Sequence, residues 1–264
     1  MKARIKRIAV AARKLDLLFL ILIVWEIFAR CIYPRFEPRA AIYLPPFSKV
    51  VAEFWMLLTD GILLTHFAAS IRRIMIGFSA AALCGVSIGI ITGLSKRTYW
   101  QVRGICDFLR PIPPVAWIPI SLLWFGITNT QQSFIIFIGV FFPILLHTII
   151  GVHAVPEEYK RAARALGSDG FSILRKVIFP AVLPRIFFGL RSGLSFAWFI
   201  IVAAEFVSAP DGLGYLILEG RNVIITERIF VGMICIGLAN IAMYYALTKI
   251  ENVLVPWAKF SFTE

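Results

Sequence analysis

One long stretch of this chain contains no Asp, Glu, Lys or Arg. It occupies residues 111–156 and reads PIPPVAWIPISLLWFGITNTQQSFIIFIGVFFPILLHTIIGVHAVP. These 46 residues are far more than the about 20 apolar residues that one helix needs to cross a bilayer. The polar residues Thr128–Gln132 interrupt the stretch and predict a turn between two spanning helices. The sequence is therefore typical of an integral membrane protein and excludes a soluble enzyme.

The rest of the chain has the same character. Of its 264 residues, 59% are hydrophobic and 16% are charged, against about 25% charged in soluble domains. We predict an all-α membrane protein with six transmembrane helices. The predicted spans are approximately Asp16–Tyr33, Ile74–Leu94, Ile112–Ile127, Ser133–Gly151, Ile186–Val207 and Ile229–Thr248.

The net charge of +12 reports the topology. With the N-terminus inside, 18 basic residues fall on the cytoplasmic side, in segments 1–15, 95–110 and 152–185 and in the C-terminal tail, and five fall on the other side. This excess follows the positive-inside rule, so both termini are expected in the cytoplasm and nucleic-acid binding is excluded. The predicted organisation is a basic cytoplasmic N-terminus (1–15), a first transmembrane helix with an outer segment (16–66), a core of five transmembrane helices (67–251) and a cytoplasmic tail (252–264).

Small residues recur every four positions in the second predicted span, at Gly77, Ala81, Gly85, Gly89 and Gly93. Such a stripe lets helix backbones approach closely in a bilayer. We favour a contact with another helix of the same chain over a seam with a second copy. The fifth predicted span repeats the pattern at Gly189, Gly193 and Ala197.

Prolines and ionisable residues inside the spans are candidates for a translocation path. The prolines after Arg110 prevent a regular first helical turn, either as a kinked entry at the cytoplasmic surface or as a broken segment beside the path. Arg191 and Glu205 share a helix face but lie about 21 Å apart, too far to pair with each other. Each either belongs to the path or lies at the membrane interface. The path candidates are Pro113, Pro114, Trp117, Arg191, Trp198 and Glu205.

Other polar residues favour structural interpretations. Glu26 and Arg30 have the spacing of a helical ion pair. The four cysteines form no C-x-x-C motif and the three histidines have no ligand spacing, so we expect neither a disulfide framework nor a metal site.

The loop of residues 155–184 carries the clearest motif. Pro156 is expected to start a helix with Glu157 and Glu158 in its first turn, and Gly167 to end it. A second short helix is expected over about Ser168–Val177. Taken alone, the loop could dock into a groove of another protein or lie on the membrane as an amphipathic helix.

The pattern Ala162-Ala163-x-x-Leu166-Gly167 with Ile173, Val177, Pro180 and Pro184 resembles the EAA loop of binding-protein-dependent ABC importer permeases. Further motifs are similar to the taurine, sulfonate, nitrate and bicarbonate branch of that family. These are Arg110–Pro114, Trp117 with Pro119, Trp124–Gly126, Phe142–Pro143, Gly189–Arg191, Ala203–Glu205 and Gly212–Tyr215. One position departs from the family pattern, because Arg161 stands where the eponymous glutamate is expected.

The resemblance implies a type I ABC importer permease with the MetI-like fold, in a bacterial cytoplasmic (inner) membrane. It implies a homodimer of permeases, two cytoplasmic ATPase subunits and an external binding protein that delivers a small anion. The residues expected to couple to the ATPase are Glu157, Glu158, Arg161, Ala162, Ala163, Leu166, Gly167 and Pro180. Those expected to meet the binding protein are Gly212, Gly214 and Tyr215.

No catalytic site is expected in this chain. None of the 18 glycines precedes a lysine, as a P-loop requires, so ATP and Mg²⁺ are expected on the partner ATPase and no cofactor on this chain. The alternative is a secondary ion-coupled transporter, which would need an ion-coupling site and usually inverted repeats. The sequence has no evident internal repeat and few carboxylates within its spans.

Overall fold

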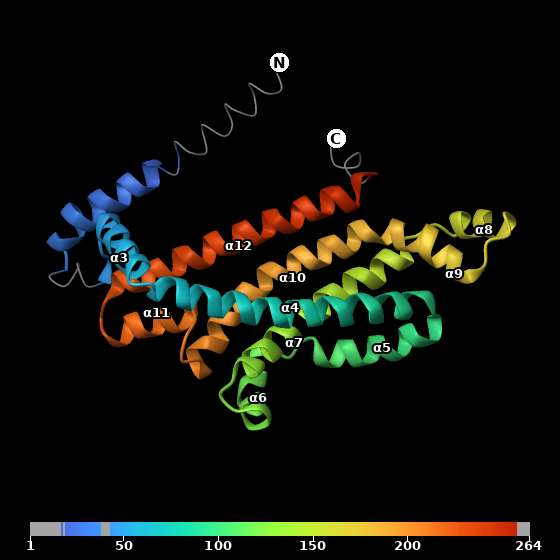
Figure 1. The fold of residues 1–264 in the computed structure, drawn as a ribbon, viewed down its shortest axis with the longest axis horizontal. Coiled ribbons are helices and arrows are strands. Elements are labelled where there is room, and N and C mark those ends of the chain that lie inside the picture. The colour runs from blue at the N-terminus through green and yellow to red at the C-terminus, as the bar shows by residue number, and fades with distance from the viewer. Residues whose placement is uncertain (1–16, 18, 38–42, 258–264) are drawn as a thin grey trace, which may run out of the picture. The chain divides into compact units, whose positions relative to one another are not determined.

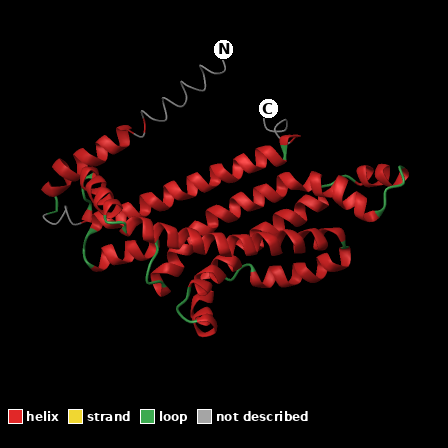
Figure 2. Cartoon of the chain, in the orientation of Figure 1, coloured by secondary structure: helices red, strands yellow, loops and turns green. Residues whose placement is uncertain are grey.

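The computed structural model describes residue 17, residues 19–37 and residues 43–257. In this part of the chain the regular elements are all helices (Figure 2). Internal contacts divide it into two units. The first contains the described residues up to His66 together with Leu216–Cys235, and the second contains Phe67–Tyr215 together with the residues from Ile236 onward.

Helix α7 (Asn129–His153) is the centre of the second unit, and α4 (Ile62–Leu94) and α10 (Phe179–Ser208) pack on it (Figure 1). A Cβ added to Gly89 of α4 would lie 2.6 Å from the Cβ of Thr148 in α7. A Cβ added to Gly193 of α10 would lie 2.9 Å from Cγ1 of Val140 in α7. Both stripes of small residues therefore make contacts within the chain, and the interpretation favoured for the α4 stripe is confirmed.

A broken helical segment also lies beside α7. It consists of α5 (Lys96–Leu109), the 3-10 helix η3 (Pro114–Trp117) and α6 (Ile118–Phe125), with a bend of 83° between α5 and the η3–α6 segment. The Tyr99 ring contacts His153 at one end of α7 with 4.8 Å between ring centroids, and the Phe125 ring contacts Phe134 near the other end at 5.1 Å. The start of α5 therefore lies beside the end of α7, and the end of α6 lies beside the start of α7.

This arrangement corrects the third predicted span, Ile112–Ile127, which is not one straight helix. The segment 95–110, which the sequence assigns to the cytoplasmic side, is mostly the helix α5. The third span was placed wrongly because α5 carries charged residues, so its apolar face is not evident from the sequence. That face packs through Cys106 against Leu145 and Ile149 of α7.

The predicted polar turn at Thr128–Gln132 is also wrong in its bounds. Thr128 caps α7, its Oγ1 accepting a hydrogen bond from the Gln131 backbone N–H at 3.4 Å. Gln131 and Gln132 lie in the first turn of α7 and are completely buried. They remain there because their amide groups make hydrogen bonds to Ser121 and Ser208.

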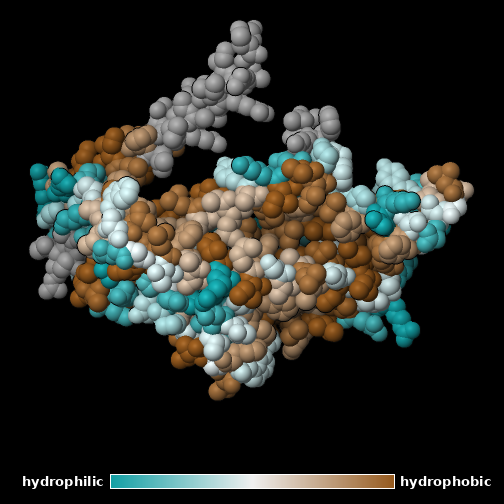
Figure 3. Space-filling model, viewed as in Figure 1, coloured by the Kyte–Doolittle hydropathy of each residue, from teal (hydrophilic) through white to brown (hydrophobic). Residues whose placement is uncertain are grey.

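Several helices have the length and composition of membrane spans. Among the described residues these are α4, α7, the helical stretch Gly170–Ser208 and α12 (Thr226–Leu254), with the bent pair as a possible fifth. The first predicted span, Asp16–Tyr33, begins outside the described residues. Large apolar side chains are exposed on these helices, among them Leu83 of α4 and Phe199 of α10, and apolar residues cover much of the surface in Figure 3. Such a surface suits a lipid environment or further protein.

The first unit contains residues 19–27, which are helical, the π-helix η1 (Phe28–Ile32) and the 3-10 helix η2 (Tyr33–Arg35). It also contains α3 (Phe47–Thr59), most of α11 (Leu213–Asn222) and the start of α12. The predicted ion pair of Glu26 and Arg30 is confirmed, with 2.8 Å between Oε1 of Glu26 and Nη2 of Arg30. Glu26 also accepts a hydrogen bond from the Ser48 backbone N–H at 3.0 Å, so it holds the N-terminal turn of α3.

Candidate functional site

The loop after α7 carries an exposed helix, α8 (Glu157–Ala165), which begins directly after Pro156. Glu157 accepts hydrogen bonds from Lys160 at 3.1 Å and Arg164 at 3.4 Å. The bond from Lys160, together with the positive charges of Lys160, Arg164 and Arg161, lowers the pKa of the Glu157 carboxyl. The acidic first turn also faces the positive end of the helix dipole. These contacts order α8 without any tertiary packing of its outer face.

Gly167 ends α8 in a left-handed conformation, with φ of +80°. The N–H of Ser168 donates to the carbonyl of Ala163 at 3.0 Å, and the N–H of Gly167 donates to that of Arg164 at 2.9 Å. This pair of bonds is the Schellman motif, so the predicted C-terminal cap is confirmed. The preceding Leu166 is 86% exposed, and a Cβ added to Gly167 would meet no atom within 4 Å. The end of α8 is therefore an open, partly apolar projection.

The second helix predicted over about Ser168–Val177 is present, but its predicted end is wrong. Asp169 caps a new helix by accepting from the Phe171 N–H at 3.3 Å, and this helix continues as α9 (Gly170–Ile173), the π-helix η4 (Leu174–Ile178) and α10. The wider π-turn precedes Pro180, whose missing N–H and ring would otherwise disturb the α-helical bonding. The loop is therefore continuous with α10.

Apolar contacts fix the base of this loop. Val152 and Val155, at the end of α7, form a buried cluster with Ile178 and Val182, and Ala163 of α8 packs against it. The other predicted coupling residues of α8 and its cap point outward. They are Glu157, Glu158, Arg161, Ala162, Leu166 and Gly167, while Pro180 is half-buried in the first turn of α10.

The predicted path residues of the broken segment lie beside a cavity of about 470 Å³. Pro113 and Pro114 line it together with α7 and α10, and Trp117 is half-buried at the end of η3. A Cβ on Gly139 of α7 would lie 2.9 Å from Cγ of Pro114, so the broken segment rests directly on the α7 backbone.

The other path candidates are engaged in the fold. Arg191 forms an ion pair with Glu251 of α12, with both side chains largely buried. Trp198 is 2% exposed, and its indole Nε1 has no hydrogen-bond partner in the described part of the chain. As expected, Arg191 and Glu205 do not pair with each other.

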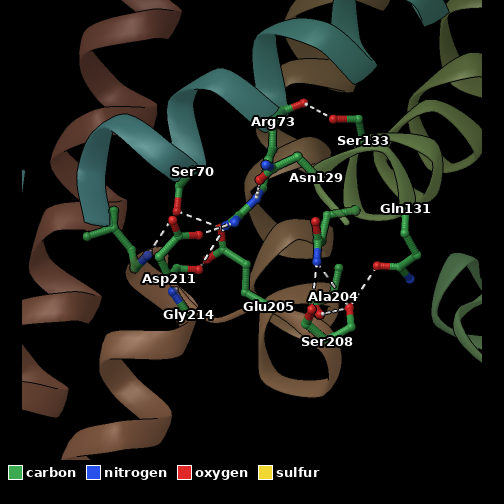
Figure 4. Close-up of polar contacts among 12 residues, drawn as sticks. Ser70, Arg73, Asn129, Gln131, Ser133, Ala204, Glu205, Ser208, Asp211 and Gly214 are labelled. Atoms are coloured by element: carbon green, nitrogen blue, oxygen red, sulfur yellow. Dashed lines mark hydrogen bonds and ion pairs between the residues drawn. The ribbon is translucent and has the colours of Figure 1, made fainter. Parts of the chain in front are cut away.

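Glu205 lies in a buried polar cluster that the sequence did not predict (Figure 4). Its carboxylate accepts hydrogen bonds from Ser70 Oγ at 2.7 Å, Arg73 Nη1 at 2.8 Å and the Gly214 N–H at 2.8 Å. Arg73 also forms an ion pair with Asp211 and donates from Nε to Oδ1 of Asn129 at 2.8 Å. We call Ser70, Arg73, Asn129, Glu205 and Asp211 the Arg73 cluster. It ties α4, α7 and α10 to the turn before α11.

Gly212 and Gly214 are part of this turn. Gly212 has φ of +115°, and a Cβ at that position would collide with the Glu205 carboxylate. A Cβ on Gly214 would lie 2.9 Å from Cβ of Glu205. Both glycines are buried, and Tyr215 is half-buried beside them. The backbone therefore closes tightly over Glu205 only because neither residue has a side chain.

The Arg73 cluster and α8 occupy opposite ends of the α7–α10 pair. The cluster involves Asn129, the first residue of α7, and Glu205, near the end of α10. The loop bearing α8 instead joins the end of α7 to the start of α10. The α7–α10 pair thus connects a rigid turn at one end with an exposed helical projection at the other.

Comparison with known proteins decides the family. Residues 85–259 match the family described as binding-protein-dependent transport system inner membrane component. The chain belongs to this family. It is a permease component of an ABC importer, which works with ATPase subunits and a binding protein.

Individual relatives cover most of the permease. A putative ABC transporter permease of Methanocaldococcus jannaschii is 39% identical over 256 residues, which cover 93% of this chain and 92% of the relative. The taurine transport system permease of Escherichia coli is 33% identical over 82% of this chain and 80% of the relative. The nitrate import permease of a Synechocystis species is 35% identical, with 75% and 72% covered.

Solved structures show the same fold at low sequence identity. An amino acid ABC transporter matches with a TM-score of 0.58 at 17% identity, covering 76% of this permease and 96% of that chain. An inward-facing methionine ABC transporter, MetNI, matches with a TM-score of 0.52 at 17% identity, covering 73% and 96%. The MetI-like type I importer fold predicted from the sequence is confirmed.

All four cysteines are free thiols. Within residues 19–37 and 43–257, no group of three or more His, Cys, Asp or Glu side chains is placed to hold a metal ion.

Proposed function

We propose that two copies of this permease form the membrane channel of the importer, and that the exposed end of α8 docks into a cleft of a cytoplasmic ATPase subunit. The observation that carries this proposal is the geometry of α8. It is a capped, exposed helix with an 86% exposed Leu166 at its end, and its base is continuous with a membrane span. A free helix end of this kind suits a groove on another protein.

The contacts around α8 explain how movement would reach the membrane. The ATPase pushes on α8, and the cluster of Val152, Val155, Ile178 and Val182 transmits the push to α7 and α10. Because packed interiors deform little, the two helices tilt together rather than absorb the motion. This tilt switches a cavity between the two copies from an outward to an inward opening. ATP and Mg²⁺ bind only to the partner, and this chain catalyses no reaction.

Arg161, which stands where the family pattern has a glutamate, lies on the same proposed docking surface. Arg161 is exposed on α8 and lies near the negatively charged Glu157, whose pKa its charge helps to lower. We propose that Arg161 offers the ATPase a positive contact in place of the family's acidic one, while Glu158 is exposed in the same helix and supplies the acidic charge.

The opposite end is proposed to receive the binding protein. The turn 209–214 is held by the Arg73 cluster, so it presents a fixed backbone surface next to Tyr215. With both termini in the cytoplasm and six spans, this turn lies on the outer side. The solute is proposed to be a small anion, because relatives are named for taurine, nitrate, aliphatic sulfonates and bicarbonate.

The experiment is uptake by proteoliposomes that contain the permease and its ATPase, with the binding protein outside and ATP enclosed. We expect uptake of one of the four solutes to require both ATP and the binding protein, and to survive a protonophore. Uptake that persists without ATP and stops with the protonophore would favour the secondary ion-coupled transporter instead. Thermal unfolding of the binding protein with each solute identifies the correct one, because a bound ligand raises the unfolding temperature.

A further inference from the structure

We propose that Arg110 is the anion-binding residue of the translocation path, and that it holds the oxyanion group of the solute in the cavity beside Pro113 and Pro114. The inference rests on the proposed function in one respect, namely that the solute is an anion.

The first argument is the depth of Arg110 in the membrane. Its side chain lines the cavity of about 470 Å³ together with Gly139 and Pro143 of α7. Gly139 lies ten residues after the start of α7 at Asn129, and Pro143 lies ten residues before its end at His153. At 1.5 Å per residue, each position is about 15 Å from its nearer end of α7, so Arg110 lies level with the middle of a core about 30 Å thick.

The second argument is the lack of a partner. No hydrogen bond or ion pair is made by the Arg110 guanidinium within the described part of the chain. Arg103, two turns earlier on α5, differs in this respect: it pairs with Asp107 at 3.5 Å and lies over the Trp100 ring at 5.5 Å. Arginine at this depth almost always pairs with another group or faces a water-filled cavity. Arg110 therefore needs either water or an anion.

The third argument is the cavity itself. Its volume is within the about 300–1,000 Å³ typical of small-molecule sites. Arg110 is the only charged residue among those that line it, and the remaining lining is apolar, including Ile138, Phe196 and Phe199. A positive charge attracts an anion more strongly in apolar surroundings than in water. The guanidinium also matches the geometry of nitrate, carboxylate and sulfonate oxygens, because it can donate two parallel hydrogen bonds.

The broken backbone explains how arginine comes to lie there. Residues 110–113 separate α5 from η3, so Arg110 is at the end of a helix rather than on its outer face. Gly139 lets Pro114 rest on α7, which keeps the break beside the cavity. Irregular backbone at membrane depth is tolerated only where protein buries it or where it lines a water-filled cavity, and the break at residues 110–114 lines the cavity.

The test uses Val115, which lines the same cavity and is 41% exposed. In a permease–ATPase complex in lipid nanodiscs, the four native cysteines are replaced by alanine and Val115→Cys is introduced. The new thiol is labelled with 2-sulfonatoethyl methanethiosulfonate, an anion, or with the trimethylammonium-ethyl analogue, a cation. We expect R110Q to lower the ratio of anionic to cationic labelling rates about tenfold or more.

Matched variants show that the effect belongs to this guanidinium. R103Q on the same helix is expected to leave the ratio unchanged, and R110K to keep most of the anion preference. Sodium nitrate is expected to slow both reagents when Arg110 is present, because an anion held in the cavity blocks access. Screening alone would instead slow the anionic reagent and speed the cationic one.

An unchanged ratio in R110Q, or an equal fall in R103Q, overturns the assignment. If R110Q does not assemble, the nitrate arm decides alone: slowing of both reagents supports the site, and opposite effects on the two reagents overturn it. The labelling needs neither ATP nor uptake. A charge-selective cavity in a complex that carries no anion would therefore contradict the proposed solute class and leave the Arg110 site standing.

Discussion

Arg73 of α4 and Glu205 of α10 form a salt bridge with 2.8 Å between Nη1 and Oε1, and each side chain is at most 1% exposed. The two residues are 132 positions apart in the sequence. Their pairing joins two helices that both pack on α7 and closes the turn that leads into α11. A charge this deeply buried is stable only when it is paired, and Arg73 is the ionic partner of Glu205, whereas Arg73 also pairs with Asp211.

We therefore predict that Glu205→Leu lowers the free energy of unfolding by about 3–5 kcal/mol, because it removes the buried one of the two carboxylates that pair with Arg73 and leaves the Ser70 hydroxyl and the Gly214 N–H without their acceptor. The double variant Glu205→Leu with Arg73→Met should lose less than the sum of the two single variants. Thermal unfolding of the detergent-solubilised complex measures both effects. Glu158→Gln, on the exposed face of α8, is the control and should change little. Strict additivity of the two single variants would contradict the pairing.

The packing of α4 on α7 predicts opposite results for two glycines. Gly89→Ala should destabilise the permease, because its Cβ would lie 2.6 Å from Cβ of Thr148. A Cβ added to Gly104 of α5 would meet no atom within 4 Å. Gly104→Ala should therefore stabilise the helix by up to about 1 kcal/mol. The yield of monodisperse protein and its unfolding temperature report both changes. Equal behaviour of the two variants would show that α4 does not pack as described.

The pair of Arg191 and Glu251 predicts rescue by charge exchange. Arg191→Glu alone should destabilise the permease by about 3 kcal/mol or more, since it places two acids together in a largely buried site. The double variant Arg191→Glu with Glu251→Arg should recover most of the stability and the uptake rate. Recovery of stability without uptake would instead assign Arg191 to the translocation path.

The low pKa of Glu157 predicts the pH dependence of α8. A carboxyl whose pKa is lower in the folded state stabilises the fold above its unfolded pKa of about 4.5 and loses this effect as the pH falls through the folded value. Hydrogen exchange of residues 157–165, corrected for the intrinsic rate, should therefore increase below pH 4.5. In Glu157→Gln this pH-dependent increase should be absent.

Local sequence patterns predicted the features that depend on local geometry. The α4 stripe, the Gly167 cap and the Glu26–Arg30 pair each follow from residues within one or a few helical turns. The Arg73 cluster could not be predicted in this way, because its members come from α4, α7, α10 and the following turn. The sequence singled out Glu205 as a carboxylate inside a predicted span, but nothing in it indicated that Arg73 is its partner. The broken span was missed because the charges of α5 are common in loops, whereas its apolar face becomes visible only against α7.

The central claim is that α8 couples the permease to an ATPase, and Gly167→Trp tests it most directly. Gly61→Trp is the matched control, because Gly61 also has a positive φ, of +74°, and also has open space around it. Both variants should insert into the membrane with similar loss of stability. The decisive measurement is binding-protein-stimulated, ATP-driven uptake by proteoliposomes that contain each variant with the ATPase. We predict that Gly167→Trp abolishes this uptake while Gly61→Trp retains it, and wild-type uptake by Gly167→Trp would contradict the account.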